Sequence, residues 1–352
     1  MDKNRLYVDL HVIQTVPPSC VNRDDTGRPK TAFYGGVNRA RVSSQSWKHA
    51  IREMFKDEIF DTDKLGFRTK YAVGIIEKKL IEGGMESGKA AKAAAEALAN
   101  AGIKVNEKKE NTTGALFFIS TVQCEKLASL VLKGEKDKKQ YKEALKSLPS
   151  VDIALFGRMV ADDANLNVDA ACQVAHSIST HAIQNEYDYF TAVDDCSPND
   201  NAGAGHLGTM EFNSSTMYRY ATVNAADLKG LIGADASAAT VGFAKAFVRS
   251  MPTGKQNSYA NRTLPDLVYV TIRRDQPINL SGAFENPVKG HNGFVADSKE
   301  ALFKHAKQVY DDYCGTPEYS FIVGYDAVLG AEKISFHELL EKLEQLLSNE
   351  VM

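Results

Sequence analysis

Paired cysteines and long apolar runs are both missing from this 352-residue sequence. Its five cysteines are scattered and never form a CxxC pair, which argues against a disulfide framework and against a zinc ribbon. No segment reaches the ~20 apolar residues that span a membrane, and the first residues lack the apolar core of a signal peptide. We therefore expect a cytoplasmic protein without membrane contact.

The chain also has little net charge and only one tryptophan. Its 43% hydrophobic and 25% charged residues are typical of a globular protein with one large domain or two smaller ones. The formal net charge is −3. A local excess of one sign therefore stands out against an almost balanced background.

The stretch from Asn22 to Arg52 carries such an excess. It contains seven lysines and arginines and two acids, so its net charge is 7 − 2 = +5. Ser43 and Ser44 stand before a run of helical periodicity and predict a hydroxyl N-cap. The apolar residues of that run share one helical face: Trp47, Ala50, Ile51 and Met54. Polar and basic residues recur on another face: Gln45, Lys48, Arg52 and Lys56.

Two interpretations of this helix are open. Free backbone N–H groups, the helix dipole and two serines make its N-terminal end a natural phosphate site, which Lys48 and Arg52 would extend along the helix. Alternatively, it is a solvated helix with an ordinary cap. Further cations nearby in the sequence favour a polyanionic partner: Arg23, Lys30, Arg39 and Arg41.

Periodicity elsewhere predicts a mixture of strands and helices. Alternating apolar residues predict a half-buried strand from Leu6 to Val12, which Pro17-Pro18 ends. Alternation also predicts a strand over 151–155, and helical spacing predicts a helix over 169–181. Residues 185–210 read as a loop or hairpin, and we interpret its glycines as flexible points because no apolar strand precedes them: Gly203, Gly205 and Gly208. The fold class is α+β or α/β.

The composition changes between Asp57 and Leu148. Alanine-rich and lysine-rich runs over 90–101 and 126–148 have high helical propensity and predict a helical insertion. Leu116 to Thr121 predicts a short buried strand within it. The lysines of 133–146 are mixed with acids, so we interpret them as a solvated helix face rather than a nucleic-acid contact.

An enzymatic interpretation rests on few residues. The pairs Asp24-Asp25 and Asp194-Asp195 could hold a cation for phosphodiester cleavage, but neighbouring carboxylates on a strand point to opposite faces. His206 has no marked nucleophile nearby, and Cys20 lacks the flanks of cysteine-enzyme motifs. We expect no catalytic residue, no metal and no cofactor.

Binding to a sugar-phosphate backbone accounts for more of the residues. The basic and hydroxyl groups of the 22–52 stretch can follow such a backbone. Tyr189, Phe190 and Met159 could stack on bases or wedge against them, and stacking is worth ~1–3 kcal/mol per base. The simpler possibility is that Phe190 and Met159 are ordinary core residues.

Long motifs in a fixed order carry a resemblance to a known family. They are NRDDTGRPKTAFYGGVNRARVSSQSWKHAIR, VDIALFGRM, HSISTH, YDYFTAVDD, GHLGTMEFNSSTMYRYATVN and GKQNSYA. They closely resemble the CasC-family backbone subunit of the type I-E CRISPR surveillance complex Cascade. The similarity covers most of the chain and is weakest over 57–148 and at the C-terminus.

The resemblance implies a hand-shaped α+β protein. Its palm would be a modified ferredoxin-like (RRM-type) sheet formed by residues 1–56, 151–182 and 215–352, the last including a C-terminal helix. A large helical insertion, residues 57–150, would form the fingers. A β-hairpin, residues 183–214, would form the thumb.

The resemblance also implies which residues contact RNA. Family positions at the guide backbone match Arg23, Lys30, Ser43, Gln45, Ser46, Lys48, His49 and Arg52. Positions that bracket a displaced nucleotide match Met159, Tyr189, Phe190 and Thr191. The sequence departs from the family at His49, where relatives can carry arginine, and at Tyr189, where they can carry tryptophan.

The implied function is a non-catalytic, RNA-binding filament subunit. Copies of the chain would polymerise along a CRISPR RNA guide, and the guide bases would stay free to pair with target DNA. The expected partners are CRISPR RNA, target DNA through the guide, further copies of the chain and other Cascade subunits. A metal-dependent endoribonuclease that uses Asp24 or Asp25 is the alternative.

Overall fold

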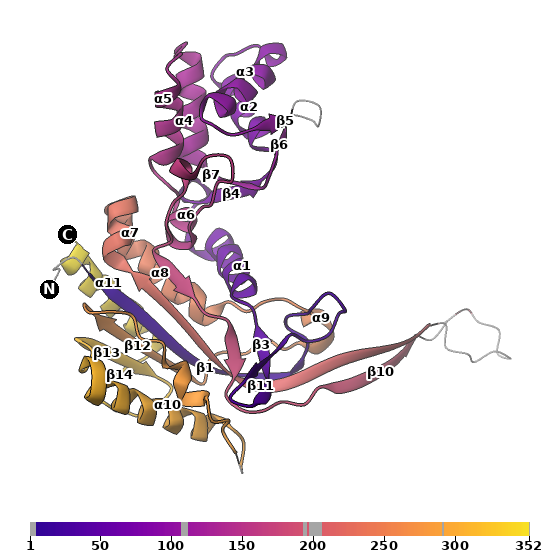
Figure 1. Ribbon diagram of the computed structural model, residues 1–352, viewed down its shortest axis with the longest axis vertical. Helices are drawn as coiled ribbons and strands as arrows, with labels where there is room; N and C mark the ends of the chain where they lie inside the picture. Colours follow the sequence, from indigo (N-terminus) through magenta and orange to yellow (C-terminus); the bar gives the residue numbers. More distant parts are fainter. Residues whose placement is uncertain (1–4, 107–111, 193–195, 197–205, 291, 352) are drawn as a thin grey trace.

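The computed structural model describes residues 5–106, 112–192, 196, 206–290 and 292–351. Figure 1 shows three parts: a body built on a large sheet, a helical unit above it, and a long hairpin that projects from the body. Eleven α-helices and a ten-stranded sheet confirm a mixed α+β fold for the described residues. No helix in these ranges is long and apolar enough to cross a membrane.

The main sheet has the strand order β14-β13-β12-β1-β11-β9-β3-β2, and β8 and β10 also pair with β11. All neighbours are antiparallel except β13 and β14. The strands are β1 (Tyr7–Ser19), β2 (Thr31–Tyr34), β3 (Val37–Val42), β8 (Cys172–Val174), β9 (Ser177–Ser179), β10 (Glu186–Ala192), β11 (His206–Asn224), β12 (Leu267–Arg273), β13 (Tyr319–Val323) and β14 (Glu332–Lys333).

Strand β1 lies at the centre of this sheet, between β11 and β12. Its residues are buried on both faces, so the prediction of a half-buried strand is wrong: Asp9 and His11 are as inaccessible as their apolar neighbours. The strand also continues through Pro17-Pro18. Its pairing with β12 ends at Ile13, and a register shift interrupts its pairing with β11 after Val16, so the prolines replace no ladder donor.

Helices cover both faces of the sheet (Figure 1). One apolar core lies between the sheet and four helices: α1 (Ser44–Met54), α7 (Ala225–Ile232), α8 (Asp235–Arg249) and α11 (Phe336–Val351). A second core on the opposite face contains α10 (Val295–Val309) and the 3-10 turn Leu280–Phe284. A short helix, α9 (Gln256–Tyr259), lies between α8 and β12 in the chain. Both faces of the sheet are therefore closed to solvent over most of its width.

The helical unit has an apolar core of its own. Its helices are α2 (Ala72–Glu82), α3 (Ser87–Asn100), α4 (Thr121–Leu132) and α5 (Lys138–Lys146). Its short strands pair as β4 (Gly66–Thr69) with β7 (Phe117–Ser120), and as β5 (Val105–Asn106) with β6 (Thr112–Thr113). The predicted helix over 90–101 and the buried strand near 116–121 are confirmed, and the lysines of α5 are exposed as expected.

Two local predictions are wrong. Residues Val151–Phe156 form helix α6 rather than a strand, and because all of 151–155 are buried, the alternation there marked no single face. Over 169–181 the chain forms β8 and β9 instead of a helix. Val174 packs into the core on one side of the sheet and Ala175 into the core on the other, as strand neighbours do.

A buried acid holds β1 to the loop after β12. The Asp9 carboxylate accepts hydrogen bonds from the Tyr220 hydroxyl (3.0 Å) and from the Ile278 N–H (2.8 Å). Burial raises the pKa of Asp9 to about 6, although these donors and Arg273 oppose the rise. Between these two pKa values, the Asp9 carboxyl keeps its proton in the folded protein, whereas in the unfolded chain, with its ordinary pKa of 3.8, it has lost it.

We predict that Asp9→Asn removes this pH dependence. A raised carboxyl pKa makes folding less favourable as pH rises between about pH 4 and pH 6. The wild-type free energy of unfolding should fall relative to the variant by up to about 3 kcal/mol over that window. Urea unfolding at a series of pH values measures the difference. Parallel pH profiles for the two proteins would contradict the prediction.

Candidate nucleic-acid interface

Helix α1 is fixed to the sheet through Trp47. The indole is 1% exposed, and its Nε1–H donates to the Ser177 hydroxyl at 2.8 Å. The guanidinium of Arg219, on β11, lies 3.7 Å from the centre of the indole ring and 4.6 Å from the ring of Phe247. Because α1 is anchored at its middle, its exposed faces are held in a fixed orientation to the body.

Arg219 itself is a buried cation with no acid beside it in the part of the chain described. It donates to Gln14 Oε1 at 2.5 Å and to the Phe247 carbonyl. Burial lowers the pKa of Arg219 to about 9, so it remains charged at neutral pH. Its charge is stabilised by aromatic faces and neutral oxygens.

The N-terminal end of α1 is capped as predicted. Ser43 accepts a hydrogen bond from the Ser46 N–H at 3.3 Å, and the Ser43 N–H donates to the Asn22 side chain at 2.9 Å. The Ser44 N–H donates to Nδ1 of His176 at 3.1 Å. His176, the first residue of the HSISTH motif and not one of the predicted RNA contacts, therefore occupies part of the expected phosphate site.

His176 lies among cations. Arg41 approaches its Nδ1 to 3.5 Å, and burial, then the charges of Arg41 and Lys30, lower its pKa. The neutral ring keeps Nδ1 free to accept from Ser44. Arg41 also donates to the Thr31 carbonyl at 3.1 Å. The end of α1 is thus surrounded by positive charge that is held in place by backbone and ring contacts.

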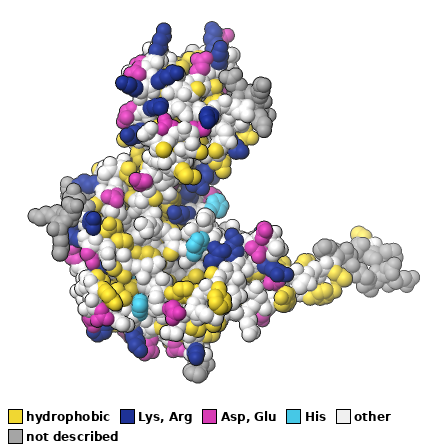
Figure 2. Space-filling view, viewed as in Figure 1, with side chains coloured by type: hydrophobic (Ala, Val, Ile, Leu, Met, Phe, Trp, Pro, Cys, Tyr) yellow, Lys and Arg dark blue, Asp and Glu magenta, His cyan; other side chains and the backbone are white. Residues whose placement is uncertain are grey.

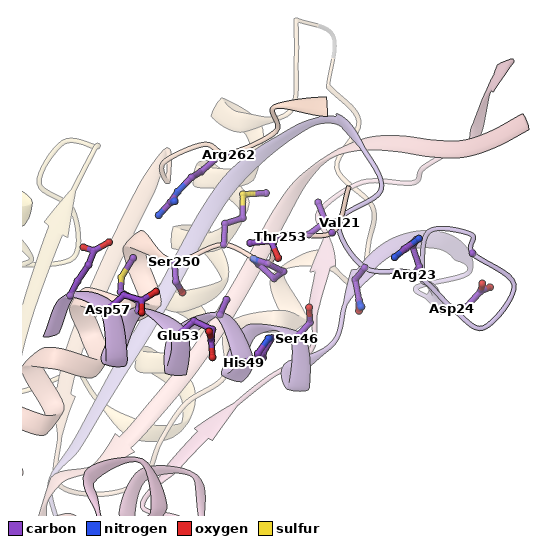
Figure 3. Close-up of a pocket in the computed structure, with 18 of the residues that line it drawn as sticks. Val21, Arg23, Asp24, Ser46, His49, Glu53, Asp57, Ser250, Thr253 and Arg262 are labelled. Carbon is purple, nitrogen blue, oxygen red and sulfur yellow. The ribbon is translucent and has the colours of Figure 1, made fainter. Parts of the chain in front are cut away.

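The predicted guide-backbone residues fall on two sides of α1. Lys48 lies 5.5 Å from the ring centre of Phe156, towards the helical unit. Ser46 and His49 line a cavity of about 650 Å³ on another side, together with Arg23 from the preceding loop (Figure 3). Gln45 is exposed at the first turn. Figure 2 shows lysine and arginine side chains gathered on the body between the hairpin and the helical unit.

The same cavity carries acids as well as bases. Glu53 and Asp57 line it one helical turn apart, facing Ser250 and Thr253 (Figure 3). The carboxylates disfavour a phosphate backbone here by charge repulsion. Lys30, Arg41 and Lys48 lie outside this acid-lined cavity, and we call these three partly exposed residues the cationic track.

Two of the counted cations have internal roles. Arg39 is fully buried and donates to carbonyls of Tyr34, Ser179, Phe284 and Glu285, so it is no part of an exposed basic surface, contrary to its use in the sequence argument. Arg28 pairs with Glu211 at the base of the hairpin, 2.8 Å apart. The positive charge that the 22–52 stretch exposes to a partner is therefore smaller than its seven lysines and arginines suggest.

Arg52 is also engaged within the chain. Its Nε donates to the buried carboxylate of Asp152 at 3.0 Å, and its guanidinium donates to the Gly66 carbonyl at 3.2 Å. Its side chain remains 22% exposed. Its predicted RNA contact would use the part of the guanidinium that these bonds leave open.

The projecting hairpin carries three of the predicted base contacts. All residues of β10 are exposed, with Tyr189 and Thr191 on one face and Phe190 on the other. Phe190 lies opposite Gly208, where an added Cβ would come within 2.4 Å of its ring. Gly208 therefore provides a flat surface for Phe190, a role beyond the flexibility inferred from the sequence. Gly203 and Gly205 lie outside the described residues.

Met159 stands apart from the hairpin, on the loop after α6. Its side chain is 85% exposed and Phe190 is 38% exposed, so neither is an ordinary core residue. Figure 1 shows the hairpin extending away from the body. Met159 and Phe190 therefore belong to different parts of the fold, the loop after α6 and the hairpin.

Asp24, one of the acids considered as a metal ligand, is engaged by hydrogen bonds within its own loop. The Asp24 carboxylate accepts from the Thr26 N–H, the Thr26 hydroxyl and the Arg28 N–H at 2.9, 2.8 and 3.0 Å. These bonds, the Thr26 hydroxyl first, lower the pKa of Asp24. Within the described ranges no group of three His, Cys, Asp or Glu residues could hold a metal. Asp194, Asp195 and the His206 side chain lie outside the description.

The fold and the site define an α+β protein with a partly exposed cationic track and a projecting hairpin that carries aromatic residues. The family model of CT1975-like proteins (Cas_CT1975) matches residues 8–348, and the chain belongs to this family. A chain of a solved "CRISPR RNA-guided surveillance complex, pre-nicking" is 32% identical, with a TM-score of 0.85 over 97% of this chain and 100% of that one. A chain of a "CRISPR RNA-guided surveillance complex" is 28% identical, with a TM-score of 0.65 over 97% and 99%. No curated protein sequence matches significantly.

We predict that Trp47→Ala lowers the free energy of unfolding by about 3–5 kcal/mol, because it leaves a large cavity and uncovers Arg219. Gln45→Ala, on the exposed side of the same helix, should change it by less than about 0.5 kcal/mol. Urea unfolding monitored by circular dichroism gives both values. A loss below about 1 kcal/mol for Trp47→Ala would show that α1 is anchored elsewhere.

Proposed function

We propose that this chain binds CRISPR RNA as the backbone subunit of an antiviral surveillance complex. The observation that carries the proposal is the cationic track at the start of α1. Lys30, Arg41 and Lys48 present charge and hydrogen-bond donors, and the cavity that Lys30 and Arg41 line, about 20 Å³, is too small to hold a base. Such a surface suits a guide whose bases must stay available for pairing.

The similarity to chains of RNA-guided surveillance complexes supports this function. The partners are CRISPR RNA, target DNA through the guide, further copies of the chain and other subunits of the complex. The family and the resemblance in sequence favour the type I-E Cascade and a cytoplasmic protein. We propose no catalytic role for any residue.

The three parts of the fold suit a hand-shaped arrangement. The body would be the palm, a modified ferredoxin-like (RRM-type) sheet, the helical unit the fingers, and the β10–β11 hairpin the thumb. Strand β10 of this hairpin is exposed along its whole length, and its Tyr187 and Tyr189 are 68% and 63% exposed. In a filament it would reach the next copy, where Met159 lies exposed, and the two would bracket a displaced nucleotide.

The alternative, a metal-dependent endoribonuclease, has less support. Three donors of its own loop bond to Oδ1 of Asp24, and neither Asp24 nor Asp25 belongs to a group of three possible metal ligands within the described residues. Complementary RNA incubated with the protein and Mg²⁺, with Asp25→Ala as the control, separates the two functions. Intact RNA in both samples excludes the nuclease.

The track predicts the salt dependence of RNA binding. Lys48→Gln should weaken binding of single-stranded RNA and reduce the slope of log Kobs against log[salt] by up to ~0.7, because one phosphate contact is lost. Fluorescence anisotropy over a salt series measures the slope.

Lys229→Gln is the matched control, since Lys229 is an exposed lysine on α7 outside the track. Its slope should equal that of the wild type. An unchanged slope for Lys48→Gln, or an equal reduction in both variants, would count against the proposed function.

A further inference from the structure

A second cavity lies where the helical unit meets the body. Its volume is about 340 Å³, and its walls come from the end of α1, from the following π-helical turn Phe55–Ile59, from β4 and from α6. Three cations and two acids line it: Arg52, Lys56, Arg68, Glu53 and Asp152. None of the residues inferred to contact RNA is on the β4 side of this cavity.

One of the two acids is fully used by the fold. Asp152 is 1% exposed, and its carboxylate accepts from Arg52, from the Gly66 N–H at 2.9 Å and from the Ser150 hydroxyl at 2.7 Å. It therefore neutralises Arg52 and ties α1, α6 and β4 together. Within the described residues its only ion pair is with Arg52, and none joins it to Arg68.

Arg68 is left with a like charge as its neighbour. Its guanidinium lies 5.2 Å from the centre of the Phe118 ring, and that of Arg52 lies 4.7 Å from the same centre. Burial, then the charge of Arg52, lower the pKa of Arg68, which Asp152 opposes. No hydrogen bond or ion pair is found for Arg68 within the described part of the chain, so its donors face the cavity unpaired.

The position of Arg68 continues the track on α1. Lys48, Arg52 and Lys56 follow one another at intervals of one helical turn, or roughly 6 Å along the axis. Arg68 extends this line from the body onto the helical unit. A guanidinium with open donors, beside a lysine and an aromatic ring, is suited to a phosphate oxygen.

We propose that this cavity binds a phosphate of the RNA backbone between Lys56 and Arg68, so that the RNA bridges the body and the helical unit. The inference rests on the proposed function and extends it to residues that no sequence motif singled out. A bound phosphate would supply the negative partner that Arg68, unlike Arg52, lacks within the described residues. The RNA would then also fix the helical unit against the body.

The test uses the full chain and a single-stranded RNA, with a single-stranded DNA of the same sequence as a second probe. Arg68→Gln and Lys56→Gln should each reduce the salt slope of RNA binding by up to ~0.7. Arg68→Lys keeps the charge and should retain the wild-type slope. Lys92→Gln, an exposed lysine on α3, a helix that contributes no residue to the cavity, is the control and should change nothing.

The outcomes separate this site from the proposed function. If Lys48→Gln lowers the slope but Arg68→Gln and Lys56→Gln do not, the cavity proposal fails and the function stands. If none of the three has an effect, both fail. An equal reduction of the salt slope in Arg68→Lys and Arg68→Gln would show that Arg68 acts by packing on Phe118, and would overturn the proposal. A reduction seen with DNA but not with RNA would also overturn it. Lys56 is exposed, so its variant should fold normally and keeps the test decisive.

Discussion

The stacking of Arg219 between Trp47 and Phe247 is the contact on which the arrangement of the molecule depends. It joins strand β11, helix α1 and helix α8 around a charge that water cannot reach. Breaking such a contact is costly, because an uncovered buried cation has no compensating acid. The orientation of α1, and with it the cationic track, follows from this one anchor.

Two other arginines also stabilise the interior of the fold. Arg39 joins the β2–β3 hairpin to β9 through the Ser179 carbonyl and to the loop after β12 through the carbonyls of Phe284 and Glu285. Arg158 bonds to carbonyls of Phe118, Leu145 and Leu166 within the helical unit. A guanidinium has five donors in a fixed plane, so it can donate to several backbone carbonyls at once. The fold uses its positive charge inside as well as outside.

Much of the fold could be predicted from the sequence, because its local patterns agree with their tertiary setting. The N-cap at Ser43, the buried face of α1, the helical insertion and the hairpin near 185–210 all follow from spacing and propensity. The strand predicted from alternation at 151–155 is wrong, since a segment that is buried on every side has no single apolar face that a pattern could indicate. Helical spacing failed at 169–181 because two short strands between two cores place apolar residues at the same intervals.

The candidate site was harder to predict than the fold. The residue types indicate a basic stretch, but the sequence does not show which arginines are exposed. Arg23 is exposed to solvent, whereas Arg39 is buried and donates to four carbonyls. The contact of His176 with α1 was not predicted, because this residue is distant in sequence from α1 and is brought to it by the pairing of β9 with β3. Arg68 was not predicted for the same reason, since β4 meets α1 only in the folded chain.

The central claim is that this protein assembles along a guide RNA. The most direct test is light scattering with the 260/280 absorbance ratio on protein purified from cells with and without a CRISPR array, together with its partner subunits. The account predicts large, RNA-loaded assemblies that require the array and whose mass follows the length of the guide. An RNA-free monomer under both conditions would contradict it.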